Sequence, residues 1–179
     1  NGWQNTVDYL NDLGYKVIVI QKEPLDYMDL KGLNNVIHPE TKSLHEAVTW
    51  LYNCEFFIGL SSGMSWLAWA LKKKVVMISG FTKQFNEFYT PYRVINENVC
   101  HGCFNMCRLN PTDWNWCPML KDTDRMFECT KSITSKMVIE KIEELLNRKN
   151  DVFYDFDWGW MNDENNPNSL FHKNAMTYE

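Results

Sequence analysis

Residues 55–79 have the sequence EFFIGLSSGMSWLAWALKKKVVMIS, in which two apolar runs flank a short apolar helix pattern. The first run, 55–60, ends at a Ser-Ser-Gly turn, and the second run, 75–78, ends at Ser79 and Gly80. Apolar strands that alternate with helices at such short spacing are typical of a parallel sheet with both faces covered. The stretch therefore predicts an α/β fold with a doubly wound parallel sheet and right-handed crossovers.

The same alternation continues on both sides of this stretch. The elements expected there are, in chain order, a helix over 4–13, strands over 16–20 and 35–38, a helix over 43–53, a short helix over 83–89, a strand over 93–95 and a helix from 134 or 135 to about 148. Ser43 and Glu46 stand three residues apart at the start of one helix, which predicts a capping box.

The pattern divides the chain into four parts. These are a Rossmann-like core over 1–97, a cysteine-rich segment over 98–130, the last helix of the core over 131–149 and an acidic, aromatic tail over 150–179. The first expected element is a helix, whereas a doubly wound domain usually begins with a strand. We therefore expect this chain to start inside a longer protein.

The net charge of the 179-residue chain is -5, and the tail carries all of it, with six acidic residues against one lysine. An acidic tail on a neutral body excludes a nucleic-acid-binding protein built on a basic surface. No apolar run reaches the roughly 18 residues of a transmembrane helix, and no signal peptide pattern opens the chain. We expect a cytoplasmic protein without a membrane span.

The Ser-Ser-Gly turn after the first run is a candidate anion site. The N-terminus of a helix offers unpaired backbone N–H groups and a partial positive charge, and open α/β sheets bind ligands at the carboxyl ends of their strands. The candidate residues are Ser61, Ser62, Gly63, Met64 and Ser65. An ordinary capped turn is the alternative, because the motif is neither a Walker A loop nor a GxGxxG fingerprint.

The end of the second run is a second candidate, consisting of Gly80, Phe81 and Thr82. In a parallel sheet this loop lies beside the first one, so Thr82 is placed to touch a second phosphate or a nucleoside. A plain strand-to-helix loop is the alternative interpretation. Neither loop contains an acidic residue that we can name as a catalytic base.

Five of the six cysteines lie within 30 residues of one another. A CxxC knuckle followed by two more distant cysteines suits a tetrathiolate metal site, whose ligands are Cys100, Cys103, Cys117 and Cys129. Cys107 is then a spare thiol and Cys54 a core residue. Such ligands accept zinc or iron alike, and disulfides are the rival interpretation. Because acidic residues outnumber basic ones within the cluster, a metal-stapled loop is favoured over a zinc ribbon that binds nucleic acid.

These motifs together resemble a known family. Residues 57–68 and 76–82 resemble the nucleotide-sugar-binding, C-terminal half of GT-B glycosyltransferases of the ADP-heptose type. The further runs 98–104, 113–118 and 127–133 resemble the bacterial autotransporter heptosyltransferases, which carry a four-cysteine iron finger. The resemblance covers about residues 4–149 and implies a Rossmann-like core that binds a nucleotide sugar, with the finger inserted in it.

The resemblance also implies a function and partners. It implies transfer of heptose from ADP-heptose to serine hydroxyls of an autotransporter adhesin, with the donor bound near residues 61–65 and 80–82. It implies iron on the four finger cysteines, with zinc as the alternative, and a ring of twelve subunits. Members of the family place the acceptor side and the proposed base in an N-terminal half, so we expect the present segment alone to be inactive.

Two alternatives remain open at this point. One is a glycosyltransferase with another donor or acceptor, such as a lipopolysaccharide heptosyltransferase, although the resemblance ties the finger to the protein-modifying group. The other is a non-enzymatic, metal-stapled interaction module in which the tail over 150–179 docks a neighbouring subunit.

Overall fold

The computed structural model describes residues 2–20, 30, 32–104, 106 and 117–148, and the structural statements below concern these residues. The chain divides into one unit over residues 1–147 and a second over 148–179. The expected tail over 150–179 and the expected spare thiol Cys107 lie outside the described residues. None of the helices in the described ranges is long and apolar enough to cross a membrane.

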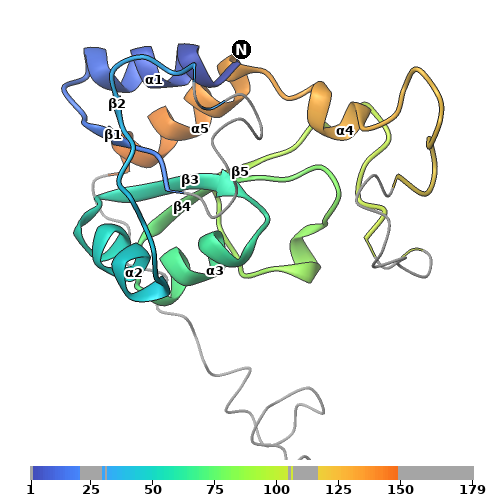
Figure 1. Ribbon diagram of the computed structural model, residues 1–179. Coiled ribbons are helices and arrows are strands. Elements are labelled where there is room, and N and C mark those ends of the chain that lie inside the picture. The colour runs from blue at the N-terminus through green and yellow to red at the C-terminus, as the bar shows by residue number, and fades with distance from the viewer. Residues whose placement is uncertain (1, 21–29, 31, 105, 107–116, 149–179) are drawn as a thin grey trace, which may run out of the picture. The chain divides into compact units, whose positions relative to one another are not determined.

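The strands are parallel, as the alternation predicts (Figure 1). In the described ranges they form a three-stranded sheet of order β3-β4-β5 and a separate pair β1-β2. Their bounds are Val17–Ile18 for β1, Val36–Ile37 for β2, Phe56–Leu60 for β3, Lys74–Ile78 for β4 and Arg93–Val94 for β5. The α/β class is therefore confirmed, with two sheets among the described residues instead of one continuous sheet.

The first two strands are shorter than predicted. Each contains two residues, whereas the apolar patterns extend over 16–20 and 35–38. Asn35, immediately before β2, has a left-handed backbone with φ of 55°, and Pro39 soon after it has no N–H for a ladder. Both features interrupt regular pairing, although the Val19 N–H still donates to the Ile37 carbonyl at 2.9 Å.

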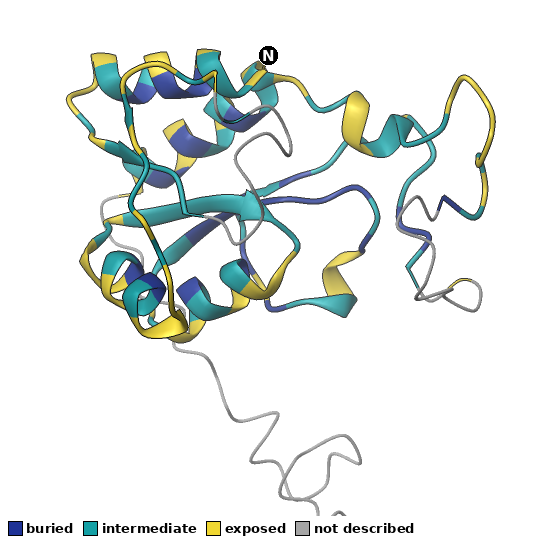
Figure 2. Ribbon diagram, viewed as in Figure 1, coloured by how far each residue is buried: buried dark blue, intermediate teal, exposed yellow. Residues whose placement is uncertain are grey.

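Helices cover both faces of the three-stranded sheet (Figure 1). One face is covered by α5 (Ser135–Asn147), against which α1 (Gly2–Asp12) packs, and the other by α3 (Gly63–Ala70), next to α2 (Leu44–Asn53). Successive side chains of a strand point to opposite faces, so β4 serves both layers. Val76 and Ile78 join the cluster of α1 and α5, while Val75 and Met77 join the cluster of α2 and α3. Figure 2 shows most of β4 as buried.

The capping box predicted at the start of α2 forms only in part. The Ser43 hydroxyl accepts from the Glu46 N–H at 3.3 Å, as predicted. The Glu46 carboxylate, however, accepts from the Lys42 N–H at 2.6 Å instead of closing the box on Ser43. Gly14 follows α1 with φ of 87°, a conformation that favours glycine.

Two segments differ from the sequence prediction. The helix expected over 83–89 is a single 3₁₀ turn, η2 (Gln84–Asn86), because Glu87 turns inward to an ion pair with Arg93. The cysteine-rich segment contains a short helix that periodicity does not reveal, α4 (Glu128–Lys131). With four residues, α4 is too short to show a repeating apolar face.

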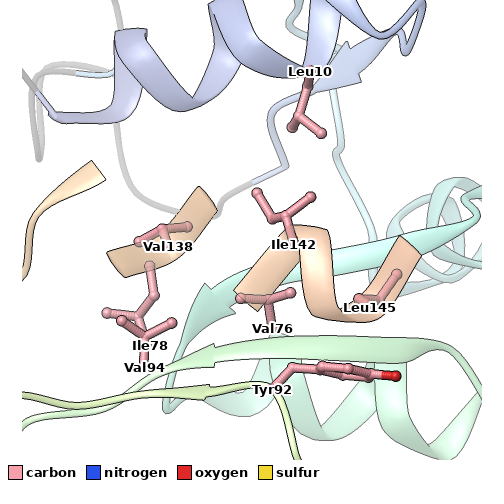
Figure 3. Packing of buried hydrophobic residues seen from close by; sticks show 8 residues of the cluster. All are labelled: Leu10, Val76, Ile78, Tyr92, Val94, Val138, Ile142 and Leu145. Atoms are coloured by element: carbon pink, nitrogen blue, oxygen red, sulfur yellow. The ribbon is translucent and has the colours of Figure 1, made fainter. Parts of the chain in front are cut away.

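Substitution of Ile142 by alanine is expected to lower the free energy of unfolding by about 2–5 kcal/mol. Ile142 has no exposed surface and lies between Leu10 of α1 and Val76 of β4, so the shortened side chain leaves a cavity at the centre of the core (Figure 3). Urea denaturation measures the change. Lys136→Ala, an exposed position on the same helix, is the control and should stay within about 0.5 kcal/mol of the wild type.

Candidate ligand-binding loops and metal centre

The first candidate loop joins β3 to α3. Ser62 is the N-cap with extended backbone, and its hydroxyl makes no capping bond to the helix. The N–H groups of Ser65 and Trp66 donate to the Ser62 carbonyl at 3.1 and 3.3 Å. The first two N–H groups of α3, at Gly63 and Met64, have no acceptor among the described residues. They point out of the helix end, where the helix dipole is positive.

Open space lies beside Gly63. A Cβ built at this glycine meets no atom within 4 Å, and both Ser62 and Gly63 are exposed. At Gly59, the last residue but one of β3, a Cβ would lie 2.4 Å from the Phe57 ring. Packing therefore explains the glycine at 59 but not the one at 63. A glycine there leaves room for an anion to approach the backbone closely.

Ser65 is placed differently from the other residues of this loop. It is fully buried, and its hydroxyl donates to the Leu60 carbonyl at the end of β3. This bond closes the turn between strand and helix. The Ser65 hydroxyl is thus engaged inside the protein, and the exposed polar groups of the loop are those of Ser62 and Gly63.

The second candidate loop follows β4, the strand next to β3. The Ser61 N–H donates to the Ile78 carbonyl at 3.3 Å, so the two loops meet at the same edge of the sheet, as predicted from parallel strands. The Thr82 side chain is buried, and its hydroxyl donates to Glu87 at 2.6 Å and lies 3.0 Å from the Ser79 hydroxyl. Thr82 therefore presents backbone, not hydroxyl, to this edge.

A buried ion pair supports the second loop, and sequence reasoning did not find it. Arg93 of β5 donates to the Glu87 carboxylate and to the Ser79 hydroxyl, the latter at 2.9 Å. The two charged side chains are only 11% and 2% exposed. Breaking one partner of such a pair costs several kcal/mol, about 3–5 in measured cases. The network fixes Ser79 and Thr82 on either side of Gly80 and Phe81.

The four predicted metal ligands share one neighbourhood. Cys103 and Cys117 are buried, whereas Cys100 and Cys129 are half-buried. Burial, followed by the negative charge of the Cys129 thiolate, raises the pKa of Cys103 to about 11, and Cys100 and Cys117 add to the effect. All five described cysteines are free thiols, which leaves no disulfide among them.

The donor chemistry of this group fits a thiophilic metal. Thiolates that raise one another's pKa repel, and a cation bound between them would remove that repulsion. In the described part of the chain, however, no three His, Cys, Asp or Glu side chains are already gathered closely enough to hold an ion. The residues therefore match the predicted ligand set in type and neighbourhood, and the structure does not show the ligation itself.

Glu128 links two cysteine-bearing segments. Its carboxylate accepts from the Cys100 N–H at 2.8 Å and from Arg125 through two bonds of 2.7 and 2.8 Å. The Arg125 hydrogen bond, followed by the Cys100 N–H, lowers the pKa of Glu128. Because Glu128 precedes Cys129, the CxxC knuckle and α4 are held together. An acidic residue beside a cysteine ligand was the only sequence signal for this role.

Comparison with known proteins identifies relatives of this chain. No protein-family profile matches the chain. The autotransporter heptosyltransferase Aah of Escherichia coli is 42% identical over 158 residues, which is 80% of this chain and 38% of Aah. The crystal structure of the dodecameric, iron-containing heptosyltransferase TibC in complex with ADP-D-β-D-heptose has a TM-score of 0.68 and 37% identity, and covers 81% of this chain and 40% of TibC.

The chain is homologous to the autotransporter heptosyltransferases. It spans about two fifths of the length of these relatives. A more distant relative, BimC of Burkholderia thailandensis, is 33% identical over 150 residues, 80% of this chain and 35% of BimC, and is described as an inactive autotransporter heptosyltransferase. Homology thus confirms the expected resemblance and the α/β fold, while BimC shows that such a relative can lack activity.

Proposed function

We propose that this chain is the donor-binding segment of a bacterial autotransporter heptosyltransferase. The whole protein would transfer heptose from ADP-heptose to a serine hydroxyl of an autotransporter adhesin in the cytoplasm. The observation that carries the proposal is the open helix end at Gly63, which has two unpaired N–H groups, in a chain 37% identical to a heptosyltransferase solved with this sugar nucleotide. The chain would form the Rossmann-like C-terminal half of a GT-B enzyme.

The role of these residues in the reaction is electrostatic. When the sugar leaves, negative charge grows on the ADP diphosphate, and N–H groups aimed at that charge lower the barrier. The N–H groups of Gly63 and Met64 and the hydroxyl of Ser62 are suited to this task. A base for the serine hydroxyl is also needed, and we assign it to the part of the enzyme outside this chain. The segment alone would therefore bind donor without transferring it.

The metal belongs to the same proposal. Cys100, Cys103, Cys117 and Cys129 would hold iron in a closed tetrathiolate site, supported by the shared neighbourhood of their sulfurs and by the iron reported in TibC. Bound iron would staple the finger together, and with all four positions filled by thiolates it would have no place for substrate. The subunits would assemble as in dodecameric TibC, with the N-terminal half of the same enzyme completing the site.

Calorimetric titration of the full-length protein that contains this chain tests the proposal. ADP-heptose and ADP are expected to bind, and UDP serves as the control ligand for ADP because its base differs while its diphosphate is retained. Incubation with an adhesin should then add the mass of one heptose to a serine. If neither ADP nor ADP-heptose binds, the proposal is wrong.

A heptosyltransferase homologue without activity is the second candidate, because BimC is described as inactive. Such a protein would act as a metal-stapled interaction module. Binding of ADP-heptose with no transfer to any adhesin would favour it. Transfer to a lipopolysaccharide acceptor instead of a protein would favour the lipopolysaccharide enzyme.

A further inference from the structure

The CxxC knuckle of the finger lies directly on the second candidate loop. The Gly102 N–H donates to the Gly80 carbonyl at 2.7 Å, and the Phe104 N–H donates to the Phe81 carbonyl at 2.9 Å. The Phe81 and Phe104 rings meet edge to face with 5.2 Å between their centroids. Two backbone bonds and a ring contact therefore join the knuckle to the loop that we assign to the donor.

The fourth cysteine touches the same loop. A Cβ built on Gly80 would lie 2.9 Å from the Cys129 carbonyl oxygen and 3.0 Å from its carbonyl carbon. These are backbone atoms, so any larger residue would force the loop and α4 apart. Gly80 is thus held between the knuckle and α4, and only a glycine fits there.

Among the described residues, helix α4 is held to the knuckle by polar contacts. No residue of α4 is fully buried, and the tie between α4 and the knuckle runs through Glu128, whose side chain is 17% exposed and pairs with the exposed Arg125. The other side of the loop, by contrast, rests on the buried pair of Arg93 and Glu87. The loop is consequently held on the core side by this ion pair, and on the finger side by the knuckle and Cys129, two segments that a metal bound to their cysteines would tie together.

We propose that the finger positions the donor loop, so that a filled metal site holds Gly80 and Phe81 in the conformation that binds the donor. The inference rests on the proposed function, since the loop must bind ADP-heptose for its position to matter. Loss of metal would then weaken donor binding through the Gly80–Gly102 and Gly80–Cys129 contacts. The finger would link donor affinity to metal occupancy, without a part in the chemistry.

Gly80→Ala in the full-length protein tests the contact itself. We expect ADP to bind about tenfold more weakly, and iron content to fall, because the new methyl group pushes Cys129 away from the loop. Gly14→Ala is the matched control. Its backbone strain at φ of 87° destabilises the fold, but no atom lies within 4 Å of its Cβ. Wild-type ADP affinity in Gly80→Ala would overturn the inference.

Removal of the metal tests the same coupling without a mutation. Wild-type protein stripped of iron by a chelator should bind ADP about tenfold more weakly, keep its far-ultraviolet circular dichroism, and recover when iron is returned. Metal-free protein with full ADP affinity would overturn the inference and leave the proposed function standing. Failure of the iron-loaded protein to bind ADP would instead overturn the proposed function.

Phe104→Leu gives a readout that does not depend on the fold surviving metal loss. The substitution retains all four cysteines and the backbone bonds but removes the ring contact with Phe81. We expect iron content to remain full and ADP affinity to fall about threefold. Unchanged affinity together with full iron would show that the knuckle does not position the loop.

Discussion

Replacement of Gly63 by aspartate is expected to weaken binding of ADP-heptose by about a hundredfold or more, with no loss of stability. The new carboxylate would occupy the open space beside the helix end and repel the diphosphate at close range. The same carboxylate suits the fold, because an acidic residue in the first turn of a helix is worth about 0.3–1 kcal/mol. Calorimetric titration and urea denaturation of the full-length protein measure the two effects separately.

Gly63→Asn is the matched control for this experiment. Asparagine has nearly the size and shape of aspartate but no charge, so it tests the space alone. We expect Gly63→Asn to bind about tenfold better than Gly63→Asp, since one close charge pair near a protein surface is worth a few kcal/mol at most. Equal affinity of both variants for ADP-heptose would show that this loop does not interact with the charge of the diphosphate. Wild-type affinity in both would remove the loop from the donor site.

The sequence predicted the strands and the helix around this site correctly because the central strand, β4, is buried on both faces of the sheet. Val75–Ile78 is a continuous apolar run, and the structure shows why: alternate residues enter the cores on opposite faces of the sheet. The position of Ser62 and Gly63 at the carboxyl end of a strand then followed from the parallel order alone. Over residues 55–79 the local sequence pattern agrees with the fold, so this stretch predicts the α/β class correctly.

Contacts between different elements explain the features that the sequence did not reveal. The helix expected over 83–89 fails because Glu87 is drawn inward to Arg93, a partner six residues away whose charge looks like a surface feature in the sequence. The Thr82 hydroxyl is taken up by the same network, and no spacing rule anticipates that. The knuckle and the second loop meet across some 20 residues of chain, which is likewise invisible to periodicity.

In the finger, too, the sequence predicts some features and not others. Thiol spacing predicts four ligands, and this set stays a prediction. Within the knuckle the structure gives Gly102 a φ of 66°, a conformation that favours glycine. Phe127, the N-cap before helix α4, has a left-handed conformation that phenylalanine rarely adopts, and no sequence pattern predicts it. Spacing also does not choose iron over zinc, because both accept tetrathiolate sites.

Replacement of Cys117 by serine is expected to lower the iron content of the full-length protein at least about tenfold, from about one iron per chain. Cys117 is buried and close enough to act electrostatically on Cys103, and a serine hydroxyl does not ionise to replace a thiolate ligand at neutral pH. If the finger also positions the donor loop, ADP affinity should fall with the iron. Elemental mass spectrometry and titration of the same sample measure both quantities.

Cys54→Ser is the matched control, since it exchanges sulfur for oxygen outside the finger. The Cys54 thiol is half-buried and lies 3.0 Å from the Leu51 carbonyl, a hydrogen bond that a serine hydroxyl can make as well. Iron content should therefore stay at the wild-type level. Loss of iron in both variants would mean that the ligands are not those of the finger. Full iron in Cys117→Ser would exclude Cys117 from the site, and zinc in the wild-type protein would contradict the assignment of iron while leaving the four sulfurs as its ligands.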